Sequence, residues 1–478
     1  MSITSASQTP GPLAAPVPPV PGAAPAAPAE VVTNIRRKAV GASMWVLIGY
    51  GSGQVIRLGS NLILTRILFP EVFGLMAMVQ LVMQGLQMFS DVGIGPSIIQ
   101  NPKGQSEPFR HTAFTIQVGR GVMLYVAALA LTWPAAAWFQ DEALISLLPA
   151  SGLIAVISGF NSTKWFLIRR NMNLARVTMI EITSQIVSLV PMIVWALAYE
   201  SVWALVIGGL VGAWMKMLLT HAALPGTPDG FAWDRESRQA LMSFGKWIFV
   251  STLVAFVSAK ADKLLLGRLM TKDQFGVYAI AVLITAVPTS ILQQMGGNIV
   301  FPAVSRRSDL PREELRRKLA KVRRPVLAAA AVGLAVLVAA GDQIVYTLWD
   351  SRYAEAGWMV SMLSLGLWPT VLWNSIGPAL RAVGQPRYGA LGDVLRLVIL
   401  SVTMMLGYRV AGIFGLIVAV VLADLPKYAA MAYGLGRERL LVWRQDVLAT
   451  LWFAAVLAAL LAGRAAAGME LPFARGWS

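Results

Sequence analysis

The stretch Ser243–Tyr278, SFGKWIFVSTLVAFVSAKADKLLLGRLMTKDQFGVY, decides the fold. It contains a membrane-length apolar helix with three charged residues near its end, then a short turn and a Phe-Gly pair that opens another apolar run. The same pattern stands 202 residues earlier in the chain. The matching pairs are Trp45 and Trp247, Arg66 and Arg268, and Phe73-Gly74 and Phe275-Gly276. We infer that the chain consists of two homologous halves, an arrangement typical of transporters whose substrate binds between the halves.

The composition indicates a polytopic membrane protein. The chain has 478 residues, of which 56% are hydrophobic and 13% charged, with a mean hydropathy of +0.64. A soluble domain has about 25% charged residues. The net charge of +16 suggests a nucleic-acid ligand at first sight, but in a membrane protein Lys and Arg gather in the cytoplasmic loops, which explains the charge without one.

Several kinds of chemistry are disfavoured by the residue counts. The chain has no cysteine and two histidines, so it has no disulfide or thiolate chemistry and offers little for a His-rich metal site. We therefore expect no cofactor and no metal site. Residues 1–34 are expected to form a disordered Pro/Ala-rich cytoplasmic tail, since a segment so rich in proline, alanine and serine cannot bury a core.

Thirteen apolar runs are long enough to cross about 30 Å of hydrocarbon. Arginine and lysine collect in alternate loops between them, which places the N-terminus in the cytoplasm and, with an odd span count, the C-terminal tail outside. Twelve or fourteen spans are the alternatives. The expected spans are 42–64, 72–98, 113–137, 144–165, 176–198, 202–221, 244–267, 275–300, 325–348, 355–380, 388–408, 411–434 and 446–466.

The repeat continues beyond its first markers. Arg169 and Glu181 match Arg381 and Asp393 at an offset of 212 residues. Each half then holds six spans, and because six is even the two halves must be parallel rather than inverted repeats. The predicted fold is an all-α polytopic membrane protein with two parallel-repeat bundles of six transmembrane helices. The expected divisions are 1–34 tail, 35–240 N-terminal bundle, 241–440 C-terminal bundle, and 441–478 an additional helix with a short tail.

The dense basic run Ser305–Arg324 is the largest expected cytoplasmic loop. Leu315, Leu319 and Val322 fall on one face of a helix there, with arginines and lysines around the rest. One interpretation is a short amphipathic helix lying on the anionic inner leaflet. The other is a topology signal with no further role.

Charged side chains inside spans are the main functional signal, because they are costly in a bilayer and usually face a cavity or a partner. The cations Arg57, Arg120, Lys260 and Lys263 are the candidate substrate-binding residues, since guanidinium and ammonium groups between the halves would bind a diphosphate. Snorkelling to the interface is the alternative for the lysines. The candidates for charge balance or proton coupling are Asp91, Glu181, Asp262, Asp393 and Arg396. Asp393 and Arg396, like Asp424 and Lys427, stand three residues apart and could instead neutralise each other within one helix.

With these residues identified, the chain resembles the oligosaccharide flippases (Wzx-type polysaccharide exporters) of the MOP superfamily. The resemblance rests on GYGSGQVIRLGSNLILTRIL from residue 49 with FGLMAMV, ADKLLLGRLMTKDQFGVYAIA from residue 261, and LRAVGQPRYGALGDVLR from residue 380. It covers residues 36–440. It implies two six-helix bundles around a V-shaped cavity, which alternates between inward- and outward-facing states while a polyprenyl-pyrophosphate-linked oligosaccharide crosses the bacterial inner membrane.

The expected function is thus a non-enzymatic flippase of lipid-linked repeat units for exopolysaccharide, capsule or O-antigen assembly. Its expected partners are polyprenyl-pyrophosphate-linked oligosaccharide, membrane lipid, polysaccharide polymerase or assembly proteins, and H⁺ or Na⁺ as the coupling ion. The alternatives are a cation-coupled drug or metabolite exporter of the same superfamily and a lipid II-type flippase. A polytopic glycosyltransferase or polymerase would need sizeable outside loops, and every expected outside loop is short.

Overall fold

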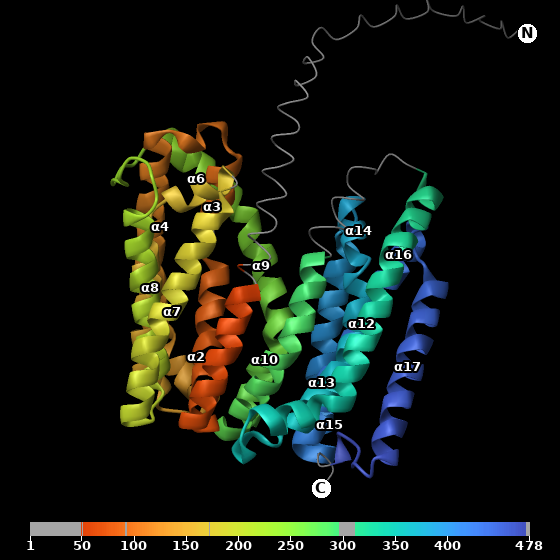
Figure 1. Cartoon of the computed structure of the whole chain (residues 1–478). Coiled ribbons are helices and arrows are strands. Elements are labelled where there is room, and N and C mark those ends of the chain that lie inside the picture. The colour runs from red at the N-terminus through yellow and green to blue at the C-terminus, as the bar shows by residue number, and fades with distance from the viewer. Residues whose placement is uncertain (1–48, 50, 91–92, 172, 296–310, 475–478) are drawn as a thin grey trace, which may run out of the picture.

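The two halves of the chain form two groups of helices that lie side by side. The computed structural model describes residues 49, 51–90, 93–171, 173–295 and 311–474. The tail 1–34 lies outside these ranges. Figure 1 shows the segment 51–67 and α2–α8 in one group, α12–α17 in the other, and α9 and α10 between them. The long helices of the first half are α2 (Pro70–Phe89), α4 (Glu107–Phe139), α5 (Leu144–Gly159), α7 (Leu174–Tyr199) and α8 (Trp203–Ala222).

The second half continues with α9 (Arg235–Leu269), α10 (Lys272–Met295), α12 (Arg312–Leu348), α13 (Ala356–Asn374), α15 (Arg387–Leu422), α16 (Asp424–Arg437) and α17 (Trp443–Ala466). Short helices cap the bundles at one end: α3 (Ile94–Gln100), η1 (Pro102–Gln105), α6 (Lys164–Arg170) and α14 (Gly377–Ala382). A further short turn, η3 (Ser351–Tyr353), lies at the other end. Within the described ranges the chain has no β-strand.

Each of the thirteen expected spans overlaps a helical segment of the described residues. Residues 42–48 of the first span and 296–300 of the eighth lie outside the described ranges. Eight helical segments there are long and apolar enough to cross a membrane, and the bent pair α5 and α6 would make a ninth. The segment Arg387–Arg437 counts once but holds two spans, because Ala411 and Gly412 leave helical geometry and divide α15. Helices α2 and α9 are not among these eight segments; α2 carries three glutamines and α9 several charged residues.

The parallel repeat is visible in the order of the helices. Arg169 lies in the last turn of α6 and Arg381 in the last turn of α14, and both short helices connect a span to the following long helix. Glu181 lies on α7 and Asp393 at the equivalent place on α15. The predicted fold class, two parallel six-helix bundles with one more helix at the C-terminus, is confirmed by this arrangement and by the solved structures reported below.

The halves meet where α2 crosses α10. A Cβ atom on Gly74 would overlap the carbonyl oxygen of Lys272, and a Cβ on Gly276 would overlap the carbonyl oxygen of Pro70. Glycine is therefore required at both positions, since any larger residue would push the two backbones apart. These are the two Phe-Gly pairs that the sequence repeat relates, so the residues that define the repeat also form its closest contact.

The basic run at residues 311–324 is not a separate amphipathic helix. It is the first part of α12, whose 37 residues extend about 55 Å at 1.5 Å per residue. Leu315 and Leu319 are buried against Ile376 and Leu380 from the α13–α14 region and Leu435 from α16. Of the two interpretations, the leaflet-bound helix does not fit Leu315 and Leu319, because the second bundle covers them, whereas Val322 of the same face is exposed. Residues 305–310 lie outside the described ranges.

Helix α17 stands outside the sequence repeat but is bound tightly to the second bundle. Near one end of α12, buried Arg323 pairs with Asp446 of α17 and donates hydrogen bonds to Ser375 Oγ at 2.7 Å and to the carbonyl of Leu372 at 2.8 Å. Near its other end, Asp342 pairs with Arg464 of α17 at 2.7 Å. The earlier residue of α12 pairs with the earlier residue of α17 and the later with the later, with the charges exchanged between the helices, so the two pairs fix both the register and the parallel direction of α17 on α12.

Candidate functional site

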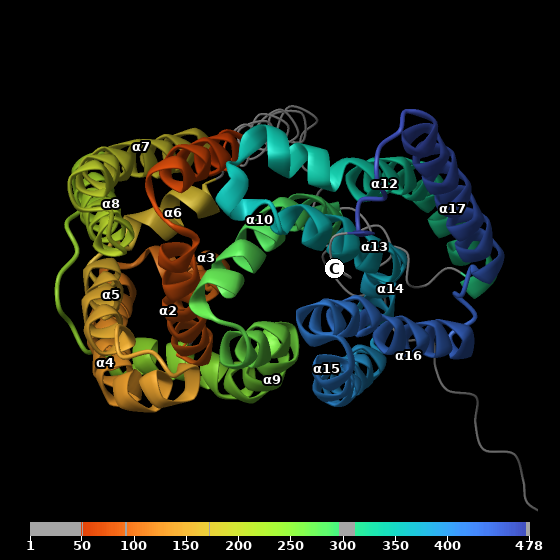
Figure 2. The ribbon, with the colours of Figure 1, turned by 90° about the horizontal axis from the view of Figure 1, so that it is seen from below.

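A central cavity of about 750 Å³ lies between the first bundle and the pair α9 and α10. Its walls come from the segment 51–67, α2, α5, α7 and α8 on one side, with Lys263 of α9 and the first turns of α10 on the other. Seen from below in Figure 2, α9 and α10 stand between the two groups of helices. The cavity therefore lies at the boundary between the halves, where the sequence repeat predicted a substrate site.

Two of the four predicted cations, Arg57 and Lys263, line this cavity. They are the charged side chains among its described lining residues, and no carboxylate occurs among those residues. The other polar groups of the wall are amides and hydroxyls, including Asn61, Gln84 and Gln185. A cavity with two positive charges and no described acidic counterpart favours an anionic ligand.

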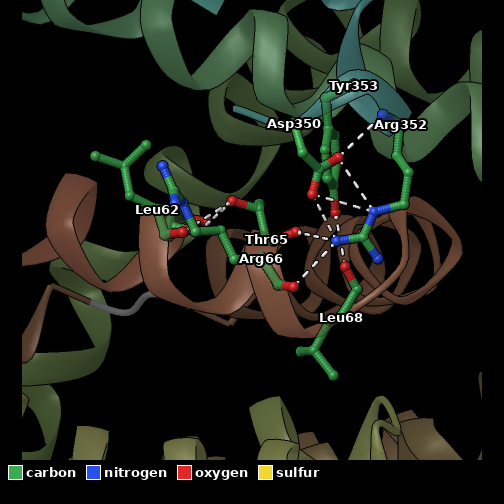
Figure 3. A network of polar contacts seen from close by, with 8 residues as sticks. Leu62, Thr65, Arg66, Leu68, Asp350, Arg352 and Tyr353 are labelled. Atoms are coloured by element: carbon green, nitrogen blue, oxygen red, sulfur yellow. Dashed lines mark hydrogen bonds and ion pairs between the residues drawn. The ribbon is translucent and has the colours of Figure 1, made fainter. Parts of the chain in front are cut away.

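One end of the cavity is closed by a set of contacts that we call the latch, formed by Asp350, Arg352 and Tyr353. Figure 3 shows these side chains directed at the end of the segment 51–67. Arg352 Nη2 donates hydrogen bonds to the carbonyls of Thr65 at 3.0 Å and Arg66 at 3.1 Å, and Tyr353 Oη donates to the carbonyl of Leu68 at 3.1 Å. The connection between α12 and α13 thus holds the end of the first span through backbone groups.

Asp350 orients the guanidinium of the latch. Arg352 Nη2 lies 2.6 Å from Asp350 Oδ2, and Nε donates to both carboxylate oxygens at 3.1 Å. The hydrogen bond from Arg352 holds the pKa of the Asp350 carboxyl below its usual range. The carboxylate is therefore ionised at neutral pH, and the latch keeps its charge pair.

The α2–α10 crossing adds further contacts at this closed end. Lys272 at the start of α10 forms an ion pair with Glu71 at the start of α2 and lies 3.8 Å from Asp141. Trp138 Nε1 donates to the carbonyl of Leu264 at 3.2 Å, and the Phe139 ring lies where a side chain at Gly267 would be. Helix α2, helix α4 and the loop after α4 thus hold the connection between α9 and α10 at this end.

A second cavity of about 330 Å³ lies inside the second bundle, lined by α9, α10, α13, α15 and α16. Arg396 Nε lies 2.7 Å from Asp424 Oδ1, and Lys427 Nζ lies 2.6 Å from Asp393 Oδ1. The predicted pairing of Asp393 with Arg396, and of Asp424 with Lys427, within one helix is therefore wrong. Helices α15 and α16 run antiparallel and approach closely at Gly392, where a Cβ would meet Lys427 Cγ at 3.1 Å. Each of these charged side chains therefore pairs with a residue of the other helix.

Asp262 and Asp424 are the two carboxylates among the described residues that line this second cavity. Asp262 is buried on α9, and the hydroxyl of Tyr278 on α10 donates to its Oδ2 at 3.3 Å. Its Oδ1 has no hydrogen-bond partner in the described part of the chain. Tyr278 lines both the central and the second cavity, so one side chain connects the Asp262 site to the central site.

The remaining predicted residues lie elsewhere. Arg120 lines a third cavity of about 330 Å³ inside the first bundle and donates to Ser90 Oγ and the Gln87 carbonyl, both at 2.9 Å. Lys260 is half-buried on α9 and Glu181 half-buried on α7, and neither lines the three cavities described here. Asp91 lies outside the described residues. The expected cluster of four cations is therefore divided, and Arg57 and Lys263 remain at the central cavity.

Sequence reasoning overlooked the amides of α2 and Tyr278, because it examined ionisable groups inside spans and not neutral polar ones. A signal for the amides existed: Gln80, Gln84 and Gln87 recur at helical spacing in an apolar segment. No such pattern marks the latch, because it joins residues far apart in the sequence through backbone carbonyls. The ion pairs that hold α17 were missed for a similar reason, since their partners are more than 120 positions apart.

The fold and the cavity define a polytopic membrane transporter built from two parallel repeats. Residues 63–357 match the family described as polysaccharide biosynthesis protein, and the chain belongs to this family. It is 22% identical over 400 residues to the lipopolysaccharide biosynthesis protein WzxC of Escherichia coli, covering 82% of this chain and 80% of that protein. It is also 22% identical over 306 residues to the teichuronic acid biosynthesis protein TuaB of Bacillus subtilis, covering 63% of this chain. The match spans 62% of the length of TuaB.

Solved structures show the same fold. The lipid II flippase MurJ in an inward closed conformation superposes with a TM-score of 0.70 at 10% identity, covering 91% of this chain and 94% of that one. An inward-facing multidrug resistance MATE family transporter of the MOP superfamily superposes with a TM-score of 0.62 at 13% identity, covering 81% and 94%. The resemblance to polysaccharide transport proteins is confirmed by the family match and the sequence relatives, the solved structures share the fold, and the expectation of a transporter rather than an enzyme agrees with them.

Proposed function

We propose that the chain is a flippase that carries polyprenyl-pyrophosphate-linked oligosaccharide repeat units across the bacterial inner membrane for exopolysaccharide, capsule or O-antigen assembly. The observation that carries the proposal is the charge of the central cavity. Arg57 and Lys263 face it from opposite halves, and its described lining holds no carboxylate. A diphosphate is the anion that such a pair suits, because guanidinium binds phosphate oxygens through two hydrogen bonds and ammonium adds a point charge.

The same observation disfavours a cation-coupled exporter of cationic drugs. A cationic substrate would be repelled by Arg57 and Lys263 and would find no described acidic group in the wall to offset them. A lipid II-type flippase would also carry a diphosphate-linked lipid, and it differs from the proposed function in the sugar that it carries. Which polysaccharide assembly proteins accept the product depends on that sugar.

In this proposal the closed end of the cavity faces the periplasm and the N-terminus lies in the cytoplasm, as the distribution of Arg and Lys predicts. The latch and the Gly74–Gly276 crossing hold the periplasmic end closed. Transport then requires these contacts to separate as the two bundles rock relative to each other, so that the periplasmic end opens and the cytoplasmic end closes. The polyprenyl chain remains in lipid throughout.

We propose Asp262 as the group that links transport to H⁺ or Na⁺. It is buried, its Oδ1 lacks a partner among the described residues, and Tyr278 joins it to the substrate cavity. Asp393 and Arg396 balance charge within the second bundle, each being held by a partner from α16. Asp262 is therefore the carboxylate lining the second cavity that forms no ion pair with a cation of the described chain.

A deletion strain tests the function. We expect loss of surface polymer and accumulation of polyprenyl-pyrophosphate-linked repeat units on the cytoplasmic face, restored by the wild-type gene and not by a gene encoding Arg57→Gln. Unchanged polymer together with new drug sensitivity would instead identify an exporter.

A further inference from the structure

Helix α2 exposes amides and little else. Of its described side chains from Pro70 to Met88, the exposed ones are Gln80, Gln84 and Gln87. Their spacing of four and three residues places them on one face of the helix. Leu81, Met83 and Leu86, on the other faces, are buried in the core.

This amide face is directed into the central cavity, because all three glutamines line it. No hydrogen bond is made by the three side-chain amides within the described part of the chain. The hydrogen bonds that Ser90 and Arg120 donate to Gln87 are accepted by its backbone carbonyl oxygen. Each amide therefore presents two donors and one acceptor to whatever occupies the cavity.

The opposite wall is polar as well. Gln185 of α7 lines the cavity, and its Oε1 is buried without a partner among the described residues. Asn61 and Ser60 line the cavity from the segment 51–67, one turn beyond Arg57. A ligand that lies along α2 would thus meet hydrogen-bonding groups on both sides and the cations at Arg57 and Lys263.

We propose that Gln80, Gln84 and Gln87 form the subsite that binds the carbohydrate part of the substrate. This inference rests on the proposed function and deepens it. The ligand class is a hydroxyl-rich sugar that is neutral or anionic, because amides match vicinal hydroxyls as both donors and acceptors. A sugar bearing a free amine would find no described carboxylate in the wall. The diphosphate binds at Arg57 and Lys263, and the sugars extend from it along the amide face.

The test is a comparison of two lipids on the purified full-length protein in nanodiscs. The probes are undecaprenyl diphosphate and undecaprenyl diphosphate bearing one N-acetylglucosamine. The test variant is Gln80→Met/Gln84→Met/Gln87→Met, since methionine keeps the length and helix preference of glutamine and removes its hydrogen bonds. The matched control is Gln343→Met, which alters an exposed glutamine of α12 that lines none of the three cavities.

We expect the wild type and Gln343→Met to bind the sugar-bearing lipid more tightly than the bare one. The triple variant should lose this preference, by roughly fivefold for each hydrogen bond removed, while its affinity for the bare lipid stays unchanged. An undiminished preference in the triple variant, or no preference in the wild type, overturns the subsite. Failure of the wild type to bind either lipid contradicts the proposed function itself.

A second readout does not depend on affinity. Because the chain has no cysteine, a Gln84→Cys variant carries a single thiol. Its reaction with a small thiosulfonate reagent should be slowed by the sugar-bearing lipid and much less by the bare lipid. Equal protection by both lipids would place the sugar elsewhere and overturn the subsite.

Discussion

Gly74 of α2 and Gly276 of α10 lie against each other at the closed end of the cavity, and each occupies a place where a Cβ would overlap backbone of the other helix. The two glycines are equivalent residues of the repeat. A contact between equivalent positions lies on the axis that relates the halves, so the two halves meet symmetrically there, and opening this end requires α2 and α10 to separate.

The first prediction concerns this crossing. Gly74→Ala and Gly276→Ala should each force α2 and α10 apart, because the obstructing atoms are backbone carbonyl oxygens that cannot move away as a flexible side chain would. A single cysteine placed at Thr65 should then react faster with a membrane-impermeant reagent added outside. Gly59→Ala is the matched control, since a Cβ at Gly59 meets nothing within 4 Å. Unchanged labelling in both crossing variants would show that the crossing does not close this end.

The second prediction concerns the cavity cations. Arg57→Gln and Lys263→Gln should each lower the affinity for undecaprenyl diphosphate by roughly tenfold or more, because each removes charge-assisted hydrogen bonds to phosphate. The amount of protein in the membrane should stay at the wild-type level. Arg409→Gln, at an exposed position of α15 outside the three cavities, is the control. Wild-type affinity in both cavity variants would remove Arg57 and Lys263 from the site.

The third prediction uses the crossed ion pairs of the second bundle. Asp424→Arg should lower thermal stability, since it places a second cation beside Arg396 in a largely buried position. Combining it with Arg396→Asp restores opposite charges in the same place and should recover part of the loss. If the double variant loses as much stability as the two single variants lose together, Arg396 and Asp424 do not interact.

The fourth prediction concerns α17. Arg464→Gln leaves the buried Asp342 without its cation and should destabilise the protein by about 3 kcal/mol or more, as expected when one partner of a buried pair is removed. Lys318→Gln is the control, because it breaks an exposed ion pair with Glu314, and such pairs contribute about 0–1 kcal/mol. Thermal denaturation in detergent measures both. Equal Tm values for Arg464→Gln and Lys318→Gln would contradict a structural role for α17.

The fifth prediction concerns pH. The pKa of Asp350 is lowered by the hydrogen bond from Arg352. The carboxylate therefore favours the closed latch at every pH above its ordinary range, and this contribution is lost only as the pH falls through the lowered pKa. The labelling rate of Thr65→Cys, divided at each pH by that of the exposed single-cysteine control Arg409→Cys to remove the fall in thiolate fraction with acid, should be flat from pH 8 to 5 and should rise only in stronger acid. A rise centred near neutral pH would show that another group controls the latch.

The sequence predicted the architecture well and the site in part. Helix positions and the repeat follow from apolar runs and from pairs such as Phe73-Gly74 and Phe275-Gly276, which are local patterns. Arg57 and Lys263 were predicted to share a cavity and do so, whereas Arg120 faces a different one. Which face of a helix meets the cavity depends on how the helix is rotated in the bundle, and spacing along one helix does not determine that rotation.

For the same reason, the sequence did not predict which side chains pair between helices. The i and i+3 spacing of Asp393 and Arg396 indicated a pair within one helix, yet each side chain reaches α16 instead. A glycine contact at Gly392 brings the helices close enough for this exchange. The latch depends on carbonyls of Thr65 and Arg66, which any residue type would supply.

Translocation in proteoliposomes tests the central claim most directly. The purified protein would be reconstituted with a fluorescent undecaprenyl-diphosphate-linked sugar in the inner leaflet, and its appearance outside would be followed with a membrane-impermeant quencher. We predict rapid exposure of the lipid with the wild type and background rates with Arg57→Gln/Lys263→Gln. Background rates with the wild type, or wild-type rates with the double variant, would contradict the account.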